Sequence, residues 1–169
     1  MDKFKGKYRI ASTRLAAWDY GSNAIYFVTI CTAGRTHYFG EVVDGEMVLS
    51  PLGRTAADCW QAIPEHFSFV VPDVCVVMPN HVHGIVVIDK PHPVQVQSSN
   101  RFGPQSQNLV SVVRGYKVGV TMYARRNDTA FSWQARYHDR VIRSEAEYER
   151  VQHYIEMNPQ QWAGDTLYN

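Results

Sequence analysis

The stretch VVMPNHVHGIVVI, residues 76–88, decides the fold. Two apolar runs flank Pro79-Asn80, a dipeptide typical of turns, so the stretch predicts the end of one strand and the whole of the next. Side chains alternate between the two faces of a strand, so His81 and His83 share one face while Val82 points to the other. Two neutral imidazoles on one face supply half of a divalent-metal site. A bare His-x-His pair is more often a pair of partly exposed polar residues on the solvent side of an amphipathic strand.

The segments before this stretch predict a strand, a hairpin and a helix. AIYFVTICT, residues 24–32, is rich in β-branched and aromatic residues, as central strands are. Further along, Asp44-Gly45 predicts a tight hairpin turn between two short strands. Ser50-Pro51 then predicts a helix start, and apolar residues at helical spacing extend that helix to about residue 66.

The segments after it begin with residues 90–108, which have neither hydrophobic period nor core and predict a flexible loop. Apolar positions from Leu109 to Tyr123 then predict a second helix, and ARYHDRVIR predicts a last strand. A third helix is expected to begin at Ser144, where Ser-Glu-Ala-Glu forms a capping-box sequence. It is expected to end near Asn158, because a proline follows. Its predicted core face consists of Tyr148, Val151 and Ile155.

The order of elements is strand, hairpin, helix, two strands, helix, strand, helix. Without the small hairpin and the last helix this is βαββαβ, the ferredoxin-like α+β arrangement of a central antiparallel sheet with helices on one face. The strand that carries the two histidines would then lie near the middle of the sheet. A chain of 169 residues predicts a single domain, residues 1–169, with a basic amino-terminal arm at residues 1–20.

The net charge is only +1, but the charges are segregated along the chain. Residues 101–143 hold eight Lys/Arg against two acids, and residues 1–20 hold five against two. Residues 36–75 hold six acids and one Arg. This separation predicts a face that binds a polyanion, with nucleic acid the usual partner, although a solvated charged face fits the pattern equally well.

Cysteine usage and hydropathy favour a cytoplasmic protein. The three cysteines, Cys31, Cys59 and Cys75, are widely spaced in apolar contexts, which predicts reduced core residues. No apolar stretch reaches the roughly 18 residues of a membrane span. The start, MDKFKGKYRI, is basic and lacks the apolar segment of a signal peptide.

The terminal helix carries a second stripe besides its core face. Arg150, Tyr154 and Asn158 are spaced i, i+4, i+8. A tyrosine is a feasible covalent nucleophile, and a side-chain amide oxygen one turn later is a feasible metal ligand. Taken alone, the stripe is more often a flanking aromatic followed by a helix terminator.

Together, VMPNHVHGIVVI and the later YIEMNP resemble the single-tyrosine HUH transposases, in particular the REP-associated branch. YFVTICT, VDGEMVL, RFGPQSQNLVSVVRGYKVGVT and WQARYHDRVIR are also similar to that branch, so the resemblance extends over nearly the whole chain. It implies that His81 and His83 are the metal-binding pair, that Asn158 is the further ligand, and that Tyr154 is the nucleophile.

The resemblance also implies a reaction and a partner. A divalent cation, Mg²⁺ or Mn²⁺, would polarise the scissile phosphate of single-stranded DNA, the partner being a hairpin-forming strand. Tyr154 would attack, leaving a 5′-phosphotyrosine and a free 3′-OH, and a later 3′-OH attack would rejoin DNA without ATP. The active site is assembled within one chain or across a homodimer. The expected DNA contacts are Arg101, Arg114, Lys117, Arg125, Arg126 and Arg150.

Two other functions remain open at this point. A DNA-hairpin-binding protein without catalysis, inactive or domesticated, would share the basic segment but would have no need for the full set of motif residues. A metal-dependent hydrolase of the amidohydrolase kind also uses His-x-His on a strand, but its barrel needs about 200 residues or more. For the enzyme we expect the histidines to open toward the basic helix and to lie within reach of Tyr154.

Overall fold

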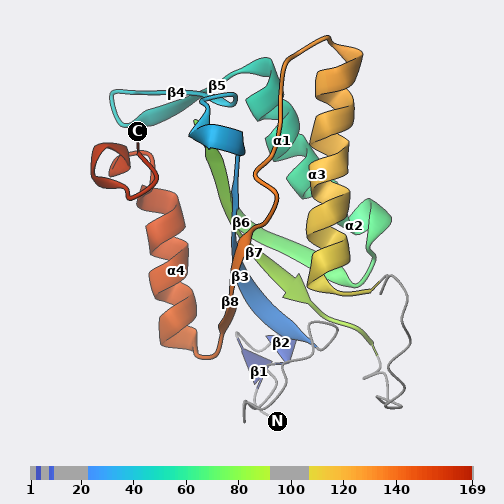
Figure 1. Cartoon of the computed structure of the whole chain (residues 1–169). Helices are drawn as coiled ribbons and strands as arrows, with labels where there is room; N and C mark the ends of the chain where they lie inside the picture. Colours follow the sequence, from blue (N-terminus) through green and yellow to red (C-terminus); the bar gives the residue numbers. More distant parts are fainter. Residues whose placement is uncertain (1–2, 5–7, 10–22, 92–106, 169) are drawn as a thin grey trace.

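A four-stranded antiparallel sheet forms the centre of the computed structural model, which describes residues 3–4, 8–9, 23–91 and 107–168. Its strand order is β6-β7-β3-β8 (Figure 1). The strands are β3 (Ala24–Cys31), β6 (Val70–Met78), β7 (His81–Ile88) and β8 (His138–Ile142). The predicted ferredoxin-like fold is therefore confirmed, with the histidine-bearing strand β7 inside the sheet.

Two helices, α1 (Pro51–Gln61) and α3 (Leu109–Arg126), cover one face of the sheet (Figure 1). Between them and the sheet lies a continuous apolar core that includes Tyr26, Val82 and Trp60. Helix α1 begins as predicted, because the hydroxyl of Ser50 accepts the Gly53 N–H at 3.0 Å.

The helix predicted to run to residue 66 is interrupted. Helix α1 ends at Gln61, and a separate short helix, α2 (Ile63–His66), follows. Pro64 explains the break, because it has no N–H to bond back along α1 and its ring would collide with the carbonyl four residues earlier.

The last helix, α4 (Glu145–Met157), packs on the opposite face of the sheet (Figure 1). Its predicted core residues Tyr148, Val151 and Ile155 are buried in one apolar cluster with side chains of β3, β6, β7 and β8. The Ser144 hydroxyl caps the Glu147 N–H at 3.2 Å. The predicted capping box is only half formed, because the Glu147 carboxylate accepts the N–H of Arg143 instead of that of Ser144.

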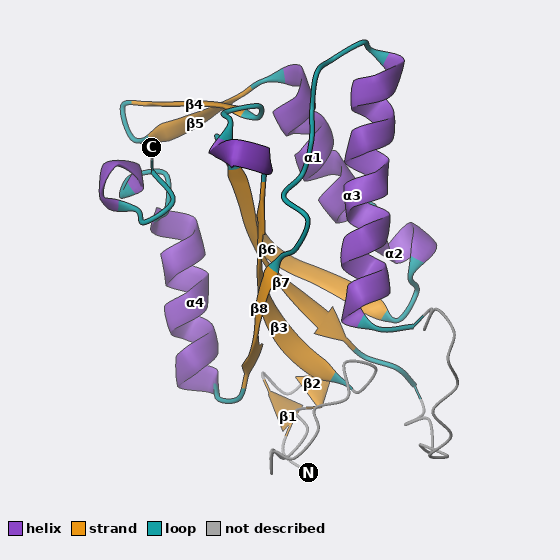
Figure 2. Cartoon of the chain, viewed as in Figure 1, coloured by secondary structure: helices purple, strands orange, loops and turns teal. Residues whose placement is uncertain are grey.

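The predicted hairpin is present as β4 (Gly40–Val43) and β5 (Glu46–Leu49), beyond one end of the main sheet (Figure 2). Asp44 and Gly45 both have positive φ, 51° and 78°, as a type I′ hairpin turn requires. The remaining short elements are β1 (Lys3–Phe4), β2 (Tyr8–Arg9), η1 (Ala33–Arg35) and η2 (Trp162–Gly164).

Two of the predicted segments fall largely outside the described residues. These are the basic arm at residues 1–20, where only the paired strands β1 and β2 are placed, and most of the loop at residues 90–108. Arg101 lies in the second of them. Within the part of the chain that is described, no helix combines the length and the apolar character needed to cross a bilayer.

Candidate functional site

His81 and His83 lie side by side on β7, under α4. Their ring centroids are 4.4 Å apart, and the residues are 0% and 3% exposed. They are therefore not solvent-facing polar residues of an amphipathic strand. Each ring is held through Nδ1, which is 2.7 Å from Asn80 Oδ1 for His81 and 2.8 Å from Thr29 Oγ1 for His83. Both Nε2 atoms are thereby left available for another partner.

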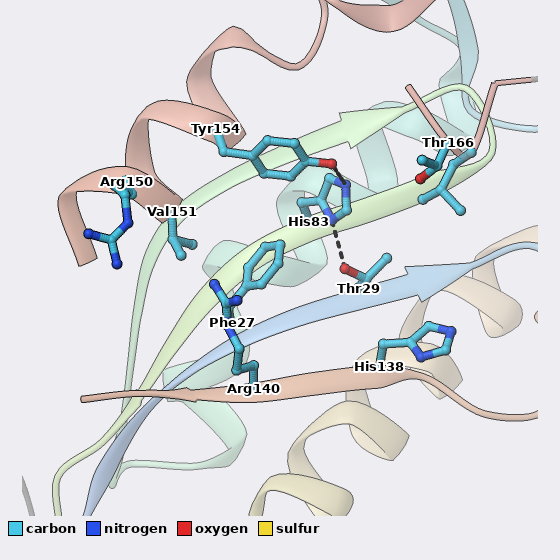
Figure 3. Close-up of a pocket in the computed structure, with 10 residues that line it drawn as sticks. Phe27, Thr29, His83, His138, Arg140, Arg150, Val151, Tyr154 and Thr166 are labelled. Carbon is cyan, nitrogen blue, oxygen red and sulfur yellow. Dashed lines mark hydrogen bonds between the residues drawn. The ribbon is translucent and has the colours of Figure 1, made fainter. Parts of the chain in front are cut away.

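Tyr154 of α4 reaches His83 of the same chain. Its hydroxyl oxygen lies 3.4 Å from His83 Nε2 (Figure 3). The ring meets Phe27 edge-on, with centroids 6.1 Å apart, and the residue is 39% exposed. One chain thus brings the predicted nucleophile and the predicted metal pair together, and the tyrosine remains accessible to a ligand.

The carboxylate of Asp165 lies next to Tyr154 and Asn158 and was missed by the sequence reasoning. Its Oδ2 accepts the Asn158 amide at 2.9 Å and the Tyr154 hydroxyl at 3.3 Å. Its Oδ1 accepts the N–H of Leu167 at 2.7 Å. Asp165 follows η2 in a segment without strand or helix periodicity, so no sequence pattern signals its position.

Ligand-type atoms of His81, His83 and Asp165 lie within 4.8 Å of one another. In the described part of the chain, His81 Nε2 and Asn158 Oδ1 are buried and make no well-formed hydrogen bond, although the Asn158 side chain is close enough to raise the pKa of His81. An orphaned buried polar atom is costly, and both of these are atoms that coordinate divalent cations. These residues therefore fit a metal ion. Asp165 adds a carboxylate that the sequence did not predict, and Asn158 remains a predicted ligand.

Burial controls the protonation of this cluster. It lowers the pKa of His81 to about 4, although the nearby Asp165 carboxylate acts in the opposite direction. Burial and the neighbouring His81 ring lower the pKa of His83 well below its ordinary value. Both imidazoles are therefore neutral at physiological pH, as a metal ligand must be. Burial and Asp165 raise the pKa of Tyr154, so the resting side chain is a phenol.

A pocket of about 490 Å³ opens beside His83 and Tyr154 (Figure 3). Its basic side chains are His138, Arg140 and Arg150. Arg150 was predicted, whereas the other two come from β8, where His138 pairs with Thr29 and Arg140 with Phe27 across the ladder. Their alternation along one strand is the signal that could have identified them.

The basic helix α3 lies on the opposite face of the sheet, so the expectation that the histidines open toward it is wrong (Figure 1). There, Arg114, Lys117 and Arg125 line a separate groove of about 390 Å³. The Lys117 ammonium donates to the carbonyls of Gln134 and Arg136, at 2.8 and 3.3 Å, and so also anchors the segment before β8. Arg126 lies in the last turn of the same helix. Of the predicted cations that the structure describes, Arg150 therefore lies on the α4 side of the sheet, and the four cations of α3 lie on the other side.

Comparison with known proteins finds a sequence relative and solved structures of similar fold. No family model matches the chain. An uncharacterized protein of Haemophilus influenzae is 38% identical over 173 residues, which covers 96% of this chain and 95% of that protein. The structure of a REP-associated tyrosine transposase bound to a REP hairpin superposes with a TM-score of 0.60 at 16% identity, covering 90% of this chain and 74% of that one. The chain therefore belongs to the same family as the Haemophilus influenzae protein, and its fold is that of the REP-associated tyrosine transposases.

Proposed function

We propose that the protein cleaves and rejoins single-stranded DNA through a 5′-phosphotyrosine intermediate, in a metal-dependent, transposase-like reaction. The observation that carries the proposal is the position of the Tyr154 hydroxyl, 3.4 Å from His83 Nε2 and beside a cluster with two orphaned ligand atoms. A purely structural tyrosine would have no need of buried neutral histidines that leave one nitrogen without a partner.

His81, His83 and an oxygen of the Asn158–Asp165 pair would hold the divalent ion. When bound, the ion would polarise the scissile phosphate and stabilise the charge that develops on it. Imidazole ligands favour Mn²⁺ over Mg²⁺, which prefers oxygen, so Mn²⁺ is expected to bind more tightly.

The Tyr154 oxygen forms the new bond to phosphorus, and the bond from phosphorus to the 3′-oxygen breaks. The phenol must lose its proton, and Asp165 Oδ2, which accepts its hydrogen bond at 3.3 Å, is the acceptor. The departing 3′-oxygen takes up a proton and becomes a free 3′-OH. A second 3′-OH can reverse these steps on the phosphotyrosine, so strand joining needs no ATP.

The pocket beside Tyr154 would receive the DNA backbone. Arg140 and Arg150 line it and can each contact a phosphate, although Arg140 also forms an ion pair of 3.3 Å with Glu147. The solved neighbour is bound to a DNA hairpin, so a hairpin-forming strand is the proposed partner. The α3 cations Arg114, Lys117, Arg125 and Arg126 would contact a more distant part of it. Arg101, outside the described residues, remains a proposed DNA contact.

The test is covalent capture of DNA by the full-length protein. The protein is incubated with single-stranded, hairpin-forming DNA from the sequences that flank its own gene, with Mn²⁺ or Mg²⁺, and adducts are resolved by denaturing electrophoresis. We expect an adduct with the wild type and with Tyr168→Phe, which changes an exposed tyrosine of the carboxy-terminal segment. Tyr154→Phe should form none while it still binds the DNA.

Two outcomes would overturn the proposal. An adduct with Tyr154→Phe would place the nucleophile elsewhere. Tight DNA binding by the wild type without any adduct would favour the non-catalytic hairpin-binding protein.

A further inference from the structure

Asn80, in the turn between β6 and β7, joins His81 to the carboxy-terminal segment, residues 159–168. The residue is 1% exposed. Its Oδ1 lies 2.7 Å from His81 Nδ1, and its Nδ2 donates to the carbonyl oxygen of Leu167 at 2.9 Å. One side-chain amide therefore contacts a metal-ligand candidate on one side and the backbone next to Asp165 on the other.

The two hydrogen bonds together fix the position of a proton. The carbonyl of Leu167 can only accept, so the amide nitrogen of Asn80 must face it and the amide oxygen must face His81. That oxygen can only accept as well, so His81 Nδ1 must carry the hydrogen. A neutral imidazole has one N–H, so His81 Nε2 is left with a lone pair, and this is the buried atom that has no partner.

His83 shows why this arrangement is specific to Asn80. Its Nδ1 is bonded to the hydroxyl of Thr29, which can either donate or accept. The Thr29 hydroxyl therefore does not select a tautomer, whereas the Asn80 amide does.

The side-chain nitrogen of Asn80 bonds to the carboxy-terminal segment, which contains Asp165. Leu167 receives the Asn80 amide on its carbonyl and donates its own N–H to Asp165 Oδ1 at 2.7 Å. The Arg35 guanidinium adds a bond to the Thr166 carbonyl at 3.0 Å. Asn80 thus holds the segment that places Asp165 within 4.8 Å of the two histidines.

We infer that Asn80 is a positioning residue of the metal centre: its amide holds His81 in the tautomer with a bare Nε2 and ties the Asp165 segment to that histidine. The role of this arrangement in metal binding rests on the proposed function. At such a site, a hydrogen bond that orients a ligand histidine also raises its basicity and so strengthens metal binding. The tautomer itself is a property of the metal-free protein and can be measured without any reaction.

The test is the ¹⁵N NMR of the histidine side chains in the full-length, metal-free protein near neutral pH, where the protonated and the bare ring nitrogens differ widely in chemical shift. The wild type should show His81 protonated at Nδ1. Asn80→Ala should shift the population toward the Nε2–H form, because Nδ1–H loses its acceptor. Asn80→Asp should restore the Nδ1–H form, because a carboxylate still accepts.

The control for a general loss of stability is the variant Asn23→Ala. Asn23 is a second asparagine whose side-chain amide joins two segments of the chain. It donates to the Lys90 carbonyl at 3.0 Å and accepts the Lys90 N–H at 2.8 Å, at the far end of β3. The Asn80 turn is also held by its main chain, since the Asn80 carbonyl accepts the N–H and the hydroxyl of Thr32 at 2.9 and 3.0 Å. Both alanine variants are therefore expected to fold, and Asn23→Ala should leave the His81 tautomer unchanged.

Mn²⁺ affinity, measured by EPR of the free ion, gives the second readout. Asn80→Ala should weaken binding by about 10- to 100-fold, the usual effect of removing an outer-shell partner, and Asn23→Ala should not. Nε2 protonation in the wild type, or the same tautomer in wild type and Asn80→Ala, would overturn the inference. Failure of the proposed function would look different, with the tautomer as expected but no covalent adduct.

Discussion

The two faces of the sheet are formed by the same strands but bury different kinds of side chain. On the face covered by α1 and α3, residues such as Tyr26, Val28 and Val82 form a continuous apolar core. On the face covered by α4, the apolar cluster occupies only one half, around Ile85. The other half buries Thr29, His81 and His83. One face thus supplies packing, and the other combines packing with the candidate chemistry.

Adjacent residues of β7 show how sharply the two faces are separated. His83 points into the polar half under α4, whereas Gly84 points to the α1 face, directly under Trp60. A Cβ on Gly84 would lie 2.3 Å from Trp60 Cζ2, so the glycine is required by packing and not by backbone conformation. Substitutions one residue apart should therefore affect stability and activity separately.

The largest effect is expected from His81→Ala, on the α4 face. Cleavage should fall on the order of 10³-fold or more, which corresponds to the several kcal/mol that a metal ion contributes to charge stabilisation. DNA affinity should change little, because the phosphate contacts come from arginines elsewhere. Adduct formation and filter binding on one preparation measure both quantities. Cleavage at the wild-type rate would show that the histidines are structural.

The converse variant, Trp60→Ala, acts on the packing face. Trp60 is 1% exposed, and its removal should lower the free energy of unfolding by about 3–5 kcal/mol. Cleavage per folded molecule should be unchanged at a temperature where the variant is still folded. Urea unfolding gives the first quantity and the adduct assay the second. A loss of cleavage in fully folded protein would show that the two faces are not independent.

The buried histidines should make the metal-free protein less stable in acid. The pKa of His81 is about 4 when folded and 6.5 in its ordinary range. Between these values the unfolded chain binds more protons, so the free energy of unfolding falls as the pH falls below about 6.5 and is level above it. His81 alone should contribute about 2 kcal/mol of loss between pH 7 and pH 5, and His83 adds to it in the same direction.

Urea unfolding in the presence of a chelator tests this dependence. His81→Gln should lose less stability on acidification than the wild type, because glutamine does not titrate. His153→Gln, at an exposed histidine of α4, should behave as the wild type does. Equal losses in all three proteins would assign the acid sensitivity to other groups.

The fold could be predicted from the sequence because each element carries its own periodicity and end signals, such as Ser50-Pro51 and Asp44-Gly45. The pairing of His81 with His83, and the stripe of Tyr154 and Asn158, followed from strand and helix geometry in the same way. The face of the sheet to which the histidines point did not follow. Every residue of β7 is buried, so the sequence does not show which face of this strand meets α3, and the expectation that the histidines face this helix is wrong.

Asp165 could not be predicted for a different reason. It reaches the site through tertiary contacts of an irregular segment, with bonds to Asn158, Tyr154 and Leu167. Hydrophobic period and motif spacing constrain helices and strands but not such segments. The tautomer of His81 likewise depends on a contact between Asn80 and Leu167 that spans 87 residues of sequence.

The smallest expected effect is on the salt dependence of DNA binding, when arginines on either side of the sheet are replaced. It decides whether DNA contacts one face of the sheet or both. Each phosphate contact that is lost should reduce the log-log salt slope of DNA binding by about 0.7–0.9. The double variant Arg140→Gln/Arg150→Gln, in the pocket beside Tyr154, should therefore reduce it by roughly 1.4–1.8 and also slow cleavage. Arg114→Gln/Arg125→Gln, in the groove on α3, should reduce the slope by a similar amount and leave cleavage of saturated complexes unchanged, because these residues lie across the sheet from Tyr154. Fluorescence anisotropy over a salt series gives the slopes. An unchanged slope for the α3 variant would make that helix a solvated charged face and confine the DNA to the side of the sheet that carries His81, His83 and Tyr154.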